Sequence, residues 1–175
     1  MRSETRRTRH ASIAAAVVVL ATSFGPAVHA MSAADGAFDA IVSHYSRIHD
    51  ALVEDSLTDV SDHATAIARI ADEALADPRA THLQVAADDL DTVRELLPEV
   101  VERARGLAET ADLEGARRAT ATLTQPLVRW QRLVDGPKPV VVYCPMHRKA
   151  WLQDDGPVEN PYDPTMLRCG SIVQR

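Results

Sequence analysis

The sequence predicts an all-α protein: an antiparallel up-and-down four-helix bundle followed by an irregular C-terminal strap. Apolar residues recur at spacings of three and four through residues 34–133, which is the pattern of amphipathic helices. Short polar turns separate these stretches, and short turns join helices that run antiparallel. The chain has 175 residues, enough for one domain of ordinary size. We therefore divide it into residues 1–30, a helical bundle over 31–135 and a strap over 136–175 packed on the bundle.

Residues 1–30 have the features of a secretory signal peptide. A basic opening precedes an apolar run over 11–24, which is shorter than the about 20 residues of a transmembrane helix. The sequence V-H-A at 28–30 provides small residues at the two positions that a signal peptidase reads. We therefore predict cleavage after Ala30 and a periplasmic or secreted protein. A membrane anchor that is retained is the alternative.

The charge of the remaining chain restricts its partners. Residues 31–175 contain 15 Lys and Arg against 24 Asp and Glu, a formal charge of −9. Nucleic acids and anionic membrane surfaces would repel such a chain. After signal cleavage we therefore expect no nucleic acid and no membrane as partner, and a protein suited to meeting cations.

Two helices are predicted before residue 78. The first covers residues 34–54, with one apolar stripe. The second begins at Ser56, which stands in the capping-box relation to Asp59, and Asp77-Pro78 ends it because the residue before proline is pushed out of the helical region. The stripe of the first helix consists of Phe38, Ile41, Val42, Tyr45, Ile48 and Leu52; that of the second consists of Val60, Ala64, Ile67, Ala71 and Ala74.

Two further helices are predicted between residues 81 and 135. A capping box at Thr81 and Gln84 opens the third, which Pro98 would kink or divide. The fourth follows Asp112, carries a second expected kink at Pro126 and ends at the D-G-P turn over 135–137. The inner face of the fourth helix consists of Leu113, Ala116, Leu123, Leu127, Trp130 and Leu133.

The strap has a different composition. Residues 140–143 form a short β-type run, and four prolines and two glycines follow it. We therefore expect an irregular segment that packs on the bundle and is fixed at its two cysteines. Trp151 and Tyr162 are interpreted as packing residues, and Asn160 as a turn residue that bonds local backbone.

Soft ligands gather in the strap. Cys144 and Met146 form one sulfur pair, and Met166 and Cys169 form another. Thiolate and thioether sulfur select Cu(I) over hard ions, and His147 adds an imidazole beside the first pair. The pattern predicts a soft-metal site, with copper as Cu(I) the expected ion.

A disulfide is the alternative at the same residues. Two cysteines in an oxidising compartment first suggest a bond between them, here Cys144–Cys169 across 24 intervening residues. Oxidised and metal-binding forms can also alternate. The sequence leaves both interpretations open.

The strap resembles a known family through four elements: C-P-M at 144–146, W-L-Q at 151–153, N-P-Y at 160–162 and M-L-R-C-G at 166–170. The family is a helical domain without a settled biochemical role. It occurs alone in exported proteins and fused to periplasmic adaptor subunits of copper/silver-type heavy-metal efflux pumps. The resemblance implies metal association and an efflux adaptor or another envelope protein as partner. Upstream it extends to Tyr45, Ile48, Ala51, Leu52, Asp55, Ala116, Arg117, Leu123 and Thr124.

A second, shorter resemblance is incomplete. The Y-C-P-M-H piece at 143–147 is similar to the opening of a heavy-metal-binding motif of copper-transport proteins. That motif continues with C-P-x-C-G-M, whereas this chain has M-L-R-C-G. With one cysteine fewer, a site of four thiolates is excluded.

The sequence predicts no enzyme. It contains no G-x-S-x-G, no H-E-x-x-H and no glycine-rich phosphate loop. His44, His49, His63 and His82 never stand four residues apart, so each is interpreted as a solvated or core histidine. The hypothesis is therefore an exported soft-metal-binding protein for metal handling or resistance. Its alternative is a disulfide-stapled envelope interaction module that binds no metal.

Overall fold

The computed structural model describes residues 36–175, so the predicted signal peptide lies outside the described residues. None of the described helices combines the length and apolar character needed to cross a membrane. The helices are α1 (Ala37–Val53), α2 (Val60–Ala76), α3 (Ala80–Leu83), α4 (Leu90–Ala108) and α5 (Leu113–Gln131), with short 3₁₀ turns η1 (Ala87–Asp89) and η2 (Pro164–Met166). The strands are β1 (Val140–Cys144), β2 (Lys149–Gln153) and β3 (Ser171–Gln174).

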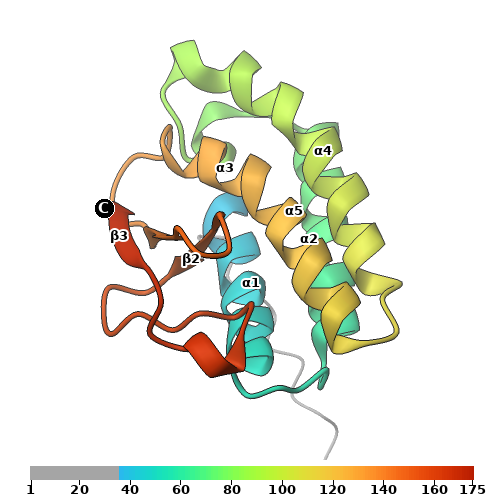
Figure 1. The fold of residues 1–175 in the computed structure, drawn as a ribbon. Coiled ribbons are helices and arrows are strands. Elements are labelled where there is room, and N and C mark those ends of the chain that lie inside the picture. The colour runs from blue at the N-terminus through green and yellow to red at the C-terminus, as the bar shows by residue number, and fades with distance from the viewer. Residues whose placement is uncertain (1–35) are drawn as a thin grey trace, which may run out of the picture. The chain divides into compact units, whose positions relative to one another are not determined.

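The prediction of a mainly helical protein is confirmed (Figure 1). The long helices pack in chain order: α1 contacts α2, α2 contacts α4, and α4 contacts α5. The fourth helix follows Asp112 as predicted, and the Asp112 carboxylate caps it by accepting a hydrogen bond of 2.7 Å from the Gly115 amide. Pro98 and Pro126 each lie inside one continuous helix, so Pro98 does not divide the third helix.

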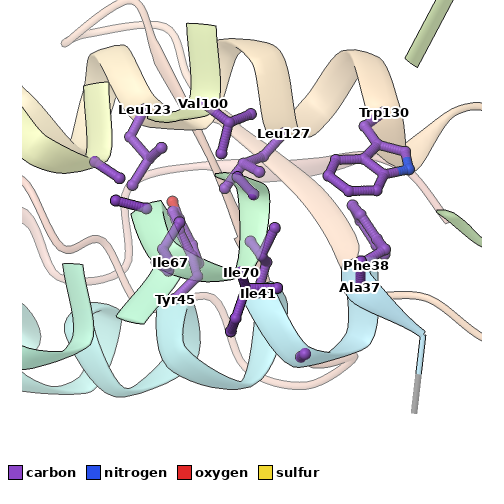
Figure 2. Close-up of a cluster of buried hydrophobic side chains, with 14 of the residues drawn as sticks. Ala37, Phe38, Ile41, Tyr45, Ile67, Ile70, Val100, Leu123, Leu127 and Trp130 are labelled. Carbon is purple, nitrogen blue, oxygen red and sulfur yellow. The ribbon is translucent and has the colours of Figure 1, made fainter. Parts of the chain in front are cut away.

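The core lies where the apolar stripes predicted it. Figure 2 shows Trp130 against Phe38, with ring centroids 5.3 Å apart. The Trp130 indole also donates a hydrogen bond of 3.1 Å to the Leu83 carbonyl, which satisfies its polar atom inside the core. The predicted stripe residues that are fully buried include Phe38, Ile41, Tyr45, Ile48, Leu52, Ala64, Ile67, Ala71, Ala74, Ala116, Leu123, Leu127 and Trp130.

The predicted all-α class with an irregular strap is wrong. The β-type run becomes β1, which pairs antiparallel with β2 on one side and β3 on the other, in the order β2-β1-β3. Val142 stands opposite Trp151 in one pair and opposite Ile172 in the other. The tail forms a sheet because one apolar strand satisfies its backbone donors and acceptors through two later segments that carry little strand signal of their own.

The sheet separates two apolar clusters. Side chains alternate between the two faces of a strand, so Val141 and Leu152 join the helical core. Val142 and Trp151 point to the opposite face. The cluster on that face, here called the outer cluster, contains Val140, Val142, Cys144, Trp151 and Tyr162.

The second helix begins later than predicted. Ser56 does not cap it; the Ser56 hydroxyl accepts a hydrogen bond of 3.0 Å from the Thr58 amide within the connecting turn. Asp55 and Asp59 both have left-handed backbones, with φ of 55° and 58°. The chain therefore turns twice before α2 starts at Val60.

The third helix is also divided differently. Gln84 adopts a left-handed backbone with φ of 58° and ends α3 after four residues. Its side chain binds α1 instead: the Gln84 amide donates to the Asp39 carboxylate at 2.7 Å and accepts from the Asp39 amide at 3.0 Å. The capping box with Thr81 is therefore wrong, because a distant helix takes the glutamine side chain.

Candidate functional site

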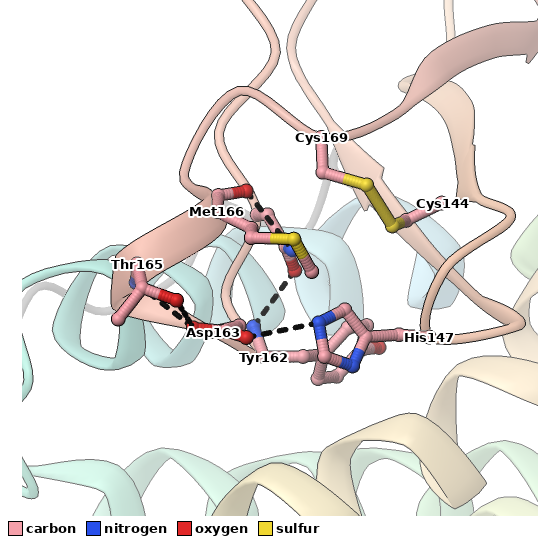
Figure 3. Close-up of a disulfide and its surroundings, with 8 residues drawn as sticks. Cys144, His147, Tyr162, Asp163, Thr165, Met166 and Cys169 are labelled. Atoms are coloured by element: carbon pink, nitrogen blue, oxygen red, sulfur yellow. Dashed lines mark hydrogen bonds and ion pairs between the residues drawn. A yellow bond between two sulfur atoms is a disulfide. The ribbon is translucent and has the colours of Figure 1, made fainter.

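Cys144 and Cys169 form a disulfide (Figure 3), with Cα atoms 5.6 Å apart. Cys144 ends β1 and is fully buried in the outer cluster, whereas Cys169 follows η2 and is partly exposed. The sequence left two interpretations of these cysteines open, a disulfide and a pair of metal ligands, and the structure contains the disulfide. The bond is compatible with an oxidising extracellular compartment.

The turn between β1 and β2 carries Met146 and His147. Met146 is 73% exposed, so its thioether does not serve as a core residue. The His147 ring lies with its Nε2 3.1 Å from the Asp163 carboxylate, which connects this turn to the segment before η2.

Asp163 provides a fixed negative charge beside the imidazole. Hydrogen bonds from the Thr165 hydroxyl and amide lower the pKa of Asp163, and His147 adds to the same shift. The carboxylate is therefore ionised at neutral pH and can accept a hydrogen bond from the His147 ring.

Met166 ends η2, is partly buried and belongs to the surroundings of the disulfide (Figure 3). Its carbonyl accepts hydrogen bonds from the Cys169 amide at 2.9 Å and from the Asn160 side chain at 3.2 Å. Asn160 also accepts a bond of 2.9 Å from the Tyr162 amide, so its predicted role as a local backbone partner is confirmed. These bonds fix the backbone that carries the second sulfur pair.

Arg117 holds the tail to the helices. Its guanidinium donates to the Pro161 carbonyl at 3.1 Å and to the Leu52 carbonyl at 3.0 Å, and it also pairs with Asp55. One side chain of α5 thus joins the end of α1 to the segment between β2 and η2. The apolar periodicity of α5 does not indicate this role, because it depends on carbonyl groups that lie far from Arg117 in the sequence.

A chain of hydroxyl groups makes a second connection. The Tyr45 hydroxyl lies 2.7 Å from the Thr124 hydroxyl, and Tyr162 donates to the Ala150 carbonyl at 2.7 Å. Burial raises the pKa of Tyr45, and burial together with Tyr45 raises that of Tyr162 well above its ordinary value. Both phenols therefore stay neutral and keep their hydrogen bonds across α1, α5 and the tail.

The arrangement can hold a soft ion only after the disulfide is reduced, because a sulfur in a disulfide is not a thiolate. Reduction would leave two thiols at the same positions, with Met166 in their surroundings and His147 on the turn after Cys144. Within residues 36–175 there is no group of three or more His, Cys, Asp or Glu side chains placed to hold a metal. The side chains that the sequence predicts as ligands are instead thiol, thioether and imidazole groups, which are types of ligand that Cu(I) accepts.

A histidine pair was missed from the sequence. The Nδ1 atoms of His44 on α1 and His63 on α2 lie 2.9 Å apart, although the two residues are 19 positions apart. One ring must donate and the other accept, so at least the accepting imidazole must be neutral for the contact to form. A search for histidines four residues apart finds only pairs on the same helix. This pair was missed because it forms by the packing of α1 on α2. His49, by contrast, is a core residue as expected, and donates from Nε2 to the Glu159 carbonyl at 2.8 Å.

The His44–His63 pair leads us to predict that the stability of the protein depends on pH. Burial lowers the pKa of His44 below its usual 6.5, and the charges of His63 and Arg69 lower it further. The unfolded chain therefore takes up a proton at a higher pH than the folded chain, and stability falls as the pH decreases from 6.5 through the folded-state pKa. We expect the thermal midpoint of wild type to decrease over this range, and that of His44→Gln to decrease less.

The control is the same change at His82, which contacts no second histidine among the described residues. His82→Gln should keep the pH profile of wild type. Identical profiles for His44→Gln and wild type would contradict the assignment.

Comparison of the chain with protein families, with curated proteins and with solved structures finds no match in any of the three.

Proposed function

We propose that this is an exported protein that binds a soft metal ion, Cu(I), through its tail when the Cys144–Cys169 bond is reduced. The observation that supports this most is the convergence of the two cysteines, from opposite ends of the tail, to a Cα separation of 5.6 Å. That separation lets two thiolates approach one ion. The resemblance to a helical domain of copper/silver efflux systems points to the same chemistry, and to metal handling, resistance or delivery to an efflux adaptor as its purpose.

Switching between the two forms is an exchange of thiols. A dithiol reductant attacks one sulfur of the disulfide through its thiolate, and its second thiol then releases the mixed disulfide. The protein gains two thiols and the reductant becomes a disulfide, so electrons and protons balance. Each cysteine loses its proton when it binds the ion. In this proposal an up-and-down frame of four helices carries the tail and keeps the two cysteines close.

The other proposed ligands differ in their role. Met166 belongs to the surroundings of the disulfide and adds a thioether there. Met146 is exposed on the turn, so in this proposal it meets an incoming ion or partner rather than completing a buried site. His147 is bonded to Asp163, so it binds a metal only by leaving that carboxylate or through its other nitrogen.

Titration of the reduced protein with Cu(I) against a competing chelator tests this proposal. We expect about one ion per chain, and a loss of at least about tenfold in affinity in Cys144→Ser and in Cys169→Ser, because an alcohol is a far poorer ligand for a soft ion. Met166→Leu should weaken binding less, since it keeps the volume and removes one thioether. His147→Ala should have the smallest effect.

The oxidised protein is the matched control and should bind no Cu(I) at the tail. Equal affinity in reduced wild type and in the double serine variant would end the metal hypothesis for these residues. Protein isolated with no thiols and no metal would favour the alternative, a disulfide-stapled envelope interaction module. The observation that favours this alternative is the disulfide itself, which joins the two ends of the tail.

A further inference from the structure

A groove with an unusual charge lies between α5 and the β1–β2 hairpin. It has a volume of about 740 Å³, and its walls carry five basic side chains and a single acidic one. The chain as a whole has the opposite balance, with 25 acidic against 19 basic residues. The groove is therefore a local reversal of the charge of the molecule. Its basic residues are Arg118, Arg129, Arg132, Arg148 and Lys149, and its acidic residue is Glu99.

The charges of the groove are only partly neutralised. Arg118 pairs with Glu114, and Arg129 pairs with Glu99. Across the groove, Arg148 and Lys149 form no ion pair with any side chain of residues 36–175. The hairpin wall therefore presents two cations that lack a carboxylate partner within the described chain.

The electrostatic surroundings of Lys149 agree with its lack of a carboxylate partner. Burial lowers the pKa of Lys149, and the positive charge of Arg118 lowers it further. The Lys149 ammonium lies 4.9 Å from the centre of the Tyr162 ring, which offers only the weak attraction of an aromatic face. An anion in the groove would lie between cations that now repel one another.

The groove has the length and the mixed lining of a polypeptide site. Arg118 and Arg132 stand 14 residues apart on the α5 side, which is about 21 Å at 1.5 Å per helical residue. An extended chain covers that length in about six residues. The lining also includes the apolar side chains of Ala121, Val128 and Tyr143, the last of which is 37% exposed. A small inorganic anion would gain no binding energy from this apolar part of the lining.

We propose that this groove binds an extended acidic segment of a partner protein, in which carboxylates alternate with apolar side chains. Carboxylates of the segment would pair with Arg148 and Lys149 on the hairpin and with Arg132 on the α5 side, and an apolar side chain would cover Tyr143. Arginine suits this role because its planar fork of donors matches a carboxylate. The groove uses none of the cysteine or methionine ligands, so the inference stands apart from metal binding.

The test uses the oxidised protein and a fluorescently labelled acidic peptide of about six residues, glutamates with leucine at alternate positions. Fluorescence anisotropy at low salt should show saturable binding that weakens as NaCl is added. Arg148→Glu/Lys149→Glu should bind the peptide at least about tenfold more weakly. The matched control is Arg79→Glu/Arg94→Glu, which makes the same change in net charge outside the groove and should bind like wild type.

Three results would overturn the proposal. One is the absence of saturable binding to wild type. Another is equal loss in the control and groove variants, which would indicate a general charge effect. The third is tight binding of inorganic tripolyphosphate with no binding of the peptide, which would make the groove a phosphate site. Thermal midpoints measured for both double variants show that each is folded, so a loss of binding reports on the groove.

Discussion

Replacing Trp130 by alanine is expected to lower the free energy of unfolding by about 3–5 kcal/mol. The side chain is fully buried, its ring packs on Phe38, and its indole nitrogen is bonded to the Leu83 carbonyl. Truncation removes the aromatic contact, leaves a cavity between α5 and α1, and leaves one buried carbonyl without its donor. Urea denaturation followed by far-UV circular dichroism measures the effect.

The conservative change separates the two contributions. Trp130→Phe keeps most of the ring but removes the donor, so it should cost about 1–3 kcal/mol, the range for an unsatisfied buried polar group. Leu75→Ala, at an exposed leucine of α2, is the control and should stay within about 0.5 kcal/mol of wild type. A loss in Trp130→Ala no larger than in Leu75→Ala would show that the core is assigned wrongly.

Removal of the disulfide in Cys144→Ala/Cys169→Ala is expected to lower stability by about 3–4 kcal/mol. The cysteines are 25 positions apart, and the chain-entropy estimate for a loop of that length gives this range. Denaturation of wild type with and without a reducing agent should show a similar difference. The double variant should be insensitive to the reductant, which is the internal control; equal midpoints for oxidised and reduced wild type would contradict the expectation.

The helical part of the fold could be predicted because its signal is local. Residues that share a face of one helix recur every three or four positions, and Leu52, Leu127 and Trp130 are buried as that periodicity indicates. The start of α5 after Asp112 could also be predicted, and its cause is local, because the Asp112 side chain caps the amide three residues further on. The buried helix faces and the start of α5 are therefore predictable because they depend on residues that are close together in the sequence.

The parts that could not be predicted depend on distant partners. Gln84 carries a helix-start pattern with Thr81, yet its side chain is taken by Asp39 on another helix, and the local pattern is overridden. His44 and His63 are separated by 19 positions and meet only because α1 packs on α2. The cationic groove likewise has one wall on α5 and another on a hairpin that was expected to be irregular.

The tail shows the same limit within the candidate site. Its cysteines were found from composition alone, and their contact is one of the two arrangements that the sequence left open. The sheet was missed because β2 and β3 lack clear alternation and take their register from β1. Gly170 has φ of 145°, and a Cβ at this position would lie 2.7 Å from the Trp151 ring, a close approach that no local pattern reveals.

The separation of the two apolar clusters by the sheet has a consequence for how the protein opens. Its inner face belongs to the helical core, and the disulfide lies on the other face with the outer cluster. Local opening can therefore involve the segment over 154–170 while the helices remain closed, and amide hydrogen exchange would detect two protection classes. Breaking the sulfur link would speed exchange in the outer class first. The redox potential of the surroundings, by forming or reducing the disulfide, would thus control the mobility of the segment over 154–170. The mobility of the helices would stay the same.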